Sequence, residues 1–101
     1  MRKNISIALD RERNLRLELN AMSIFEEVTG KSLFTIGEGL QEARNIRGLL
    51  YASLKSAGED LTLDQVGELI TMDNFNIVSE TISKLMTVSY GKNEDATEEK
   101  K

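Results

Sequence analysis

The chain has 101 residues, of which 13 are Lys or Arg and 17 are Asp or Glu, giving a formal net charge of −4. Cysteine, histidine and proline are absent, so disulfides, thiolate zinc sites and a histidine general base are excluded. The acidic balance argues against a nucleic-acid partner, because phosphates usually require a basic protein face. Apolar residues make up 40% and aromatic residues 5% of the chain, which predicts one domain, residues 1–90, with an aliphatic core.

Two short segments near the N-terminus alternate apolar and polar residues. Apolar side chains share one side of each segment, namely Ile5, Ile7 and Leu9 in residues 4–9, and Leu15, Leu17 and Leu19 in residues 14–19. A period of two predicts half-buried strands, here a β-hairpin that turns at residues 10–14. Asn14 suits a left-handed backbone position in that turn. A continuous helix is the alternative, since Leu, Arg and Glu favour helices, but its face beyond Leu9 would be charged.

A short helix over residues 21–29 is expected next. Asn20 suits its N-terminal cap, and Ser23 with Glu26 offers an alternative capping box. Gly30 is expected to end the helix in a left-handed conformation. The following connector, residues 32–39, is expected to turn its apolar side chains inward; these are Leu33, Phe34 and Ile36.

The longest helical pattern covers residues 39–57 and predicts the central helix. Its apolar face recurs every three or four residues, at Leu40, Ala43, Ile46, Leu50, Leu54 and Ala57, widened by Leu49 and Ser53. The polar residues of this helix are expected to point away from that face; they are Gln41, Glu42, Arg44, Asn45 and Lys55. A stripe this broad must be covered from more than one side.

Two further helices are predicted after a stop at Gly58. The first covers residues 63–72, and Thr62 with Gln65 fits a capping box at its start. The second begins after Asp73 or Asn74 and runs to about residue 90. Its main apolar face comprises Phe75, Val78, Ile82, Leu85 and Met86. Residues 91–101 are expected to form a disordered polar tail, so the predicted class is α+β, mostly helical, with one hairpin and about four helices.

Fragments that look catalytic have simpler explanations. Residues 29–32, Thr-Gly-Lys-Ser, match the end of a P-loop but lack its earlier glycine. The acidic pairs at residues 26–27 and 59–60 are expected to be solvated surface. No convergent set of carboxylates is visible, so no catalytic residue, metal ligand or cofactor is predicted.

Apolar residues off the main helical faces indicate a partner-binding surface, although small helices can also simply be wrapped more completely. The predicted partner-binding residues are the off-face residues Tyr51, Ile77, Val88 and Tyr90, together with Phe75 and Met86 on the main face of the last helix. No apolar run approaches the roughly 18 residues of a membrane span, so no membrane partner is expected.

The order of motifs over residues 4–90 allows a family comparison. The strand segment with Leu17 and Leu19 is followed by Asn20 and a predicted helix. This helix carries the acidic pair at residues 26–27 and ends with Thr-Gly at residues 29–30. The helical segments at residues 46–54 and 61–70 follow in the same order as in the family. This succession resembles the tail assembly chaperones of long-tailed, siphovirus-type bacteriophages.

The resemblance implies a non-enzymatic protein of the host cytoplasm that is absent from the finished virion. It implies binding of the tape measure protein, a very long and largely helical chain, together with self-association as a homo-oligomer. A frameshifted longer form would recruit the tail tube protein. Methionines such as Met22, Met72 and Met86 suit varied partners, because they repack easily.

A small helical regulatory or DNA-binding module is the alternative function. Residues 61–88 can be read as two helices around a turn at residues 72–74. Against it, the last predicted helix carries Lys84 as its one basic residue, which is too little for phosphate contacts.

Overall fold

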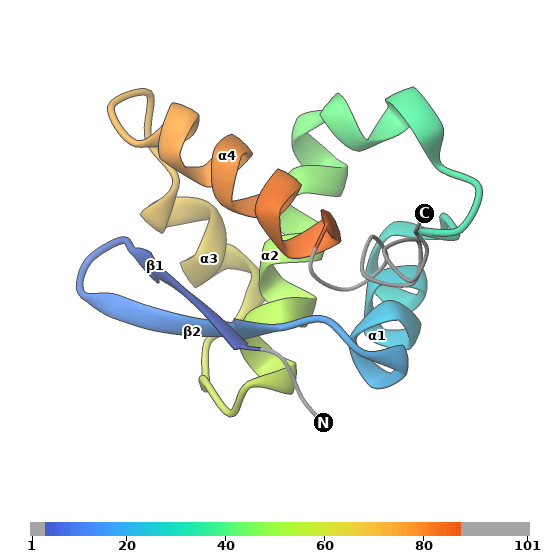
Figure 1. The fold of residues 1–101 in the computed structure, drawn as a ribbon, viewed down its shortest axis with the longest axis horizontal. Coiled ribbons are helices and arrows are strands. Elements are labelled where there is room, and N and C mark those ends of the chain that lie inside the picture. Colours follow the sequence, from blue (N-terminus) through green and yellow to red (C-terminus); the bar gives the residue numbers. More distant parts are fainter. Residues whose placement is uncertain (1–3, 88–101) are drawn as a thin grey trace, which may run out of the picture.

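The computed structural model describes residues 4–87 (Figure 1). The elements in chain order are β1 (Asn4–Ala8), β2 (Glu12–Arg16), α1 (Leu19–Thr29), the 3₁₀ helix η1 (Gly37–Gln41), α2 (Ala43–Ser56), α3 (Leu63–Leu69) and α4 (Phe75–Met86). This order confirms the predicted class, an N-terminal hairpin followed by four α-helices in one compact globule. The predicted domain limit at residue 90 and the polar tail at residues 91–101 lie outside the described residues.

Helix α2 lies at the centre of the molecule, with α1 on one side and α3 on the other (Figure 1). Because α1, α3 and β2 all pack against it, α2 is buried on more than one face, as its broad apolar stripe requires. Its buried residues are Asn45, Ile46, Gly48, Leu49, Leu50, Ala52, Ser53 and Leu54. The core is therefore aliphatic apart from Phe25, which α1 contributes.

The hairpin places one strand on each of two helices. Its antiparallel register pairs Ile5 with Leu15 and Ile7 with Arg13. Ile7, Leu15 and Leu17 are buried, as the period-two pattern predicts. Strand β1 packs against α4, whereas β2 packs against α2. The hairpin thus joins α4 to the central helix.

The turn and the end of the hairpin differ from the prediction. The turn is shorter, at residues 9–11, and the Leu9 amide donates to the Arg11 carbonyl at 3.0 Å. The Asp10 carboxylate accepts the Arg11 amide at 2.9 Å, which stabilises this tight turn. Asn14 therefore pairs with Ser6 inside the ladder, and the predicted left-handed position is wrong.

Helix α1 begins two residues earlier than expected. Its N-cap is Glu18, with no side-chain capping hydrogen bond, so both the Asn20 cap and the Ser23 capping box are wrong. Leu19 is consequently a helical residue with 71% of its surface exposed, not an inward strand residue. Gly30, at φ 74°, ends the helix and donates its amide to the Glu26 carbonyl, which confirms the predicted C-terminal cap.

The predicted helix over residues 39–57 is interrupted. Glu42 is extended between η1 and α2, and the Asn45 amide group donates to the Gly39 carbonyl at 2.7 Å. Asn45 is buried by this contact, contrary to prediction, while Ala43 is exposed rather than inward. The Asn45 hydrogen bond holds η1 against the start of α2, and the kink turns the first residues of α2 away from the predicted face.

The connector before η1 is only partly inward. Leu33 is buried and Ile36 packs against the core, as expected. The prediction that Phe34 turns inward is wrong, because 64% of its surface is exposed.

The Thr62–Gln65 capping box at the start of α3 is confirmed. The Gln65 amide donates to Thr62 Oγ1 at 3.1 Å, and the Thr62 amide donates to Gln65 Oε1 at 2.8 Å. The helix ends at Leu69, before the predicted residue 72. Asn74 explains the early end, because its Nδ2 donates to the Leu69 carbonyl and its Oδ1 accepts the Thr71 amide, both at 2.8 Å.

Asn74 also precedes α4 as its N-cap residue, one of the two predicted choices, but its side chain makes no capping hydrogen bond to α4. The inward face of α4 comprises Val78, Ile82 and Leu85. Phe75, predicted on that face, is 36% exposed. The predicted helix end at residue 90 lies outside the described residues.

An ionic cluster fastens the hairpin to the turn after α2. Gly58, at φ 95°, directs the chain back so that Glu59 accepts the Asn14 amide at 3.1 Å and Arg13 Nη1 at 3.0 Å. Asp10 accepts Arg13 Nε and Nη2 at 3.0 and 2.7 Å. The side chains of Arg13 and Glu59 are only 9% and 11% exposed, so the prediction that Glu59 is solvated is wrong.

These contacts change the acidity of both carboxylates. The pKa of Asp10 is lowered to about 2, mainly because the Arg13 side chain donates hydrogen bonds to its carboxylate. The Asn14 amide, followed by Arg13, lowers the pKa of Glu59. Both groups are therefore more acidic in the folded protein than in an unfolded chain.

Replacing Glu59 by Gln tests the ionic cluster. We expect Glu59→Gln to lower the free energy of unfolding at pH 7 by about 1–3 kcal/mol, because nearly buried Arg13 loses a charged acceptor. Urea denaturation measures this change. Asp60→Asn, at the exposed neighbouring position, is the matched control and should shift stability by less than about 0.5 kcal/mol. Equal effects of the two variants would contradict the cluster's contribution.

Acid should weaken the fold through the same two groups. Because their folded pKa values are lowered, their stabilisation is complete above the unfolded value of about 4 and is lost as the pH falls toward 2. We expect the melting temperature to drop over this window, measured by circular dichroism. The Asp10→Asn/Glu59→Gln variant should show a smaller drop; an identical profile would show that other carboxylates govern acid unfolding.

The close packing of α1 on α2 requires a glycine at residue 48. A Cβ there would lie 2.5 Å from Thr29 Cγ2, and Thr29 is held because its Oγ1 donates to the Phe25 carbonyl at 2.7 Å. We expect Gly48→Ala to lower the free energy of unfolding by about 1–3 kcal/mol. Gly67→Ala is the control, since its Cβ would meet the flexible Arg47 side chain at 3.1 Å. That variant should be neutral or gain up to about 1 kcal/mol, and a loss as large as that of Gly48→Ala would refute the steric explanation.

Candidate partner-binding groove

Two adjoining hollows lie between α2 and α4, and we call them together the α2–α4 groove. The first has a volume of about 650 Å³ and is lined by Ala43, Arg44, Ile46, Arg47, Gly67, Ile70, Thr71, Met72 and Phe75. The second has a volume of about 380 Å³ and is lined by Leu40, Gln41, Ile46, Ser79, Ile82, Ser83, Met86 and Thr87. Ile46 lines both hollows, so the two are neighbours on either side of this side chain.

The groove follows from the way α4 is held. Strand β1 packs against α4, and a hollow remains between α4 and η1. Leu40 and Met86 pack only partly against the core. Apolar side chains therefore remain accessible along this side of α4.

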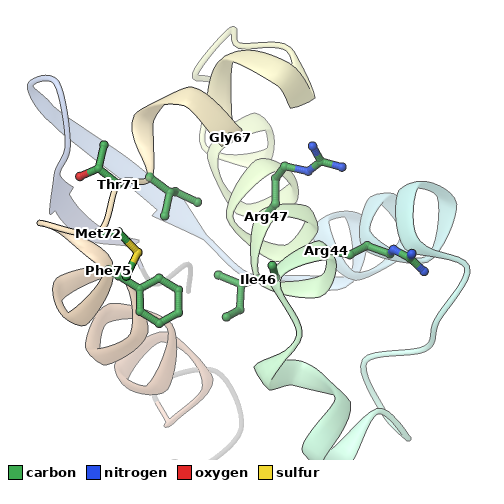
Figure 2. A pocket seen from close by; sticks show the side chains of 9 residues that line it. Arg44, Ile46, Arg47, Gly67, Thr71, Met72 and Phe75 are labelled. Carbon is green, nitrogen blue, oxygen red and sulfur yellow. The ribbon is translucent and has the colours of Figure 1, made fainter.

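The first hollow gathers apolar side chains from three segments. Ile46 on α2 points toward Phe75 on α4, and Met72 lies beside Phe75 in the loop between α3 and α4 (Figure 2). Met72 is 90% exposed, which is unusual for a large apolar side chain. Exposed apolar groups around a hollow are typical of protein-binding sites, and methionine adapts to varied surfaces.

Two arginines form the α2 side of the first hollow. Arg44 and Arg47 are the charged residues among those that line it, and Figure 2 shows their guanidinium groups pointing away from Ile46 and Phe75. A Cβ added at Gly67 would lie 3.1 Å from Arg47 Cδ, so the Arg47 side chain passes close to α3. Within residues 4–87 neither arginine has an ion-pair partner.

The second hollow has a different character. No charged residue is among those that line it, and its apolar members are Leu40, Ile46, Ile82 and Met86. Along α4, Phe75 of the first hollow and Ile82 of the second are seven residues apart, a rise of about 10.5 Å. The groove thus offers two apolar depressions two helical turns apart.

The six predicted partner-binding residues do not gather at one site in the structure. Phe75 and Met86 line opposite ends of the groove. Ile77 is 47% exposed but lines neither hollow, and Tyr51 is half-buried against the core. Val88 and Tyr90 lie outside the described residues.

Sequence reasoning missed other residues of the groove. The sequence pattern predicts Ile46 only as a core residue, and it does not single out Arg44 and Arg47 as binding residues. Their signal is a pair of arginines one helical turn apart on the edge of an apolar stripe, a common pattern on solvated helices. The pattern becomes informative only when α3 and α4 are seen to border it.

A smaller polar hollow of about 290 Å³ lies on the other side of η1, lined by Lys31, Ser32, Thr35, Ile36, Gly39, Glu42 and Asn45. Asn45 Oδ1 is buried without a hydrogen-bond partner there. In residues 4–87 no group of three or more acidic, His or Cys residues could hold a metal ion, and no helix there is long and apolar enough to cross a membrane.

Comparison with known proteins adds no identification. A scan against protein-family models gave no match, and searches of curated proteins and of solved structures gave none either.

Proposed function

We propose that this protein is a tail assembly chaperone of the kind found in long-tailed bacteriophages, and that it binds the tape measure protein without catalysing a reaction. The observation that carries the proposal is the α2–α4 groove, where Met72 and Phe75 are accessible beside Ile46. The resemblance over residues 4–90 supplies the identity of the client. A groove between helices is a common site for an amphipathic helix.

The surface of the protein suits such a role. A net charge of −4 keeps a complex with an apolar client dispersed, because like-charged complexes repel one another. The client would be held in the host cytoplasm until the tail tube forms around it, and the chaperone would be absent from the virion.

Self-association and tube recruitment belong to the same proposal. The sheet in the described residues has two strands. The outer edge of each strand therefore has no neighbouring strand in this sheet. Such edges can pair with a second copy and build a homo-oligomer. A longer form made by frameshifting would extend the chain beyond residue 101 and recruit the tail tube protein.

Co-expression tests the client. We expect the tape measure protein encoded beside this chain to be several-fold more abundant in the soluble fraction when the chaperone is present, because its apolar helices are covered. The Met72→Ser/Phe75→Ser variant should lose this effect while remaining folded by circular dichroism. Leu19→Ser removes a similarly exposed apolar residue on α1 and should retain it. A soluble fraction that is the same with and without the chaperone would refute the proposed function.

A further inference from the structure

The register of the hairpin shows which backbone groups face out of the sheet. In an antiparallel pair, residues that bond to the opposite strand alternate with residues whose N–H and C=O groups point outward. The Asn14 amide donates to Glu59 rather than to β1, so Asn14 and its partner Ser6 are outward residues. The Leu9 amide donates to the Arg11 carbonyl across the hairpin, which fits this alternation. The outward residues of β1 are therefore Asn4, Ser6 and Ala8.

The chain itself closes the outer edge of β2. Glu59 Oε2 accepts the outward Asn14 amide at 3.1 Å, and Arg16 Nη1 donates to the Ser56 carbonyl at 3.4 Å. The turn after α2 thus lies along this edge. Strand β2, Glu-Arg-Asn-Leu-Arg, is also rich in charge, which is a common protection of sheet edges. A further strand could add to β2 only by displacing Glu59.

The outer edge of β1 lacks these protections. Helix α4 packs against β1 but leaves Ser6 and Ala8 exposed. Within residues 4–87 the outward backbone groups of Ser6 and Ala8 make no hydrogen bond to a loop, a helix or a side chain. The strand, Asn-Ile-Ser-Ile-Ala, contains neither a charged residue nor a proline. Such an edge is a template for another strand.

We infer that β1 pairs antiparallel with β1 of a second copy, in a two-fold dimer centred on Ser6. In this register Ser6 lies opposite the partner's Ser6 and Asn4 opposite the partner's Ala8, so the two chains exchange about six backbone hydrogen bonds. A second copy suits this edge because an uncharged strand meets no like charge in its own image and because the outward residues are symmetric about Ser6.

The dimer would contain a four-stranded sheet in the order β2–β1–β1–β2. Glu59 closes both of its ends, so the assembly stops at two copies. The inference rests on the self-association named in the proposed function, to which it adds the edge, the direction and the register.

Single cysteines test the register, because the chain contains no cysteine. Opposed residues of a hydrogen-bonded pair lie about 5.5 Å apart at Cα, which a disulfide can bridge. Ser6→Cys should therefore cross-link to its copy under mild oxidation, measured on non-reducing gels. Ala8→Cys and Asn14→Cys are matched controls, since both residues are exposed and share the outer face of the hairpin with Ser6. Each would lie about 14 Å from its own copy, too far for a disulfide.

We expect Ser6→Cys to form the disulfide dimer at least about fivefold faster than either control. A parallel pair would cross-link Ala8→Cys as fast as Ser6→Cys, and pairing of β2 edges would cross-link Asn14→Cys instead. Random collision would give equal rates for all three variants. Any of these results would overturn the inference.

Light scattering tests the same interface without a cross-link. The wild type should have twice the chain mass of 11.3 kDa. Ser6→Lys places two lysines directly opposite each other, which destabilises a strand pair, so this variant should be a monomer while remaining folded by circular dichroism. Asn14→Lys adds the same charge one strand away and should remain a dimer. A monomeric wild type, or a Ser6→Lys variant with the mass of the wild type, would contradict the inferred dimer.

The outcomes also separate this inference from the proposed function. A monomeric wild type that still solubilises the tape measure protein would refute the β1 dimer and leave the chaperone role intact. A Ser6-centred dimer without any solubilisation would refute the chaperone role alone.

Discussion

The attachment of the hairpin to α2 is the constraint on which the rest of the structure depends. A two-stranded hairpin is marginally stable alone in water, so it must bury Ile7, Leu15 and Leu17 against helices. The Arg13–Glu59 contact at 3.0 Å adds a link between the hairpin and the turn after α2. Strand β1 in turn supports α4, and this indirect support leaves the α2–α4 groove open.

The groove presents accessible apolar surface. Ile46, Met72 and Phe75 provide contact area, whereas the guanidinium groups of Arg44 and Arg47 point away from Ile46 and Phe75 (Figure 2). Contact area of this kind is tolerant of sequence, because dispersion and hydrophobic contacts are not directional.

Much of the fold could be predicted because it follows from local patterns. The period-two strands, Gly30 at a left-handed position and the Thr62–Gln65 capping box each depend on a few neighbouring residues. The errors have tertiary causes. Asn45 is buried because it binds the Gly39 carbonyl, and Glu59 is nearly buried because a hairpin more than 40 residues away supplies its partners. In the groove, Phe75 and Met86 were predicted from their positions on α4, but Ile46, Arg44 and Arg47 were not.

The sequence by itself determined the kinds of elements, their order and the aliphatic nature of the core, since hydrophobic period and capping residues act over one or two helical turns. It also excluded thiol and imidazole chemistry, because no cysteine or histidine is present. The tertiary structure alone decided where apolar side chains stay accessible. That outcome depends on how α4 rests on β1 beside α2, a packing between segments about 70 residues apart that no local pattern encodes.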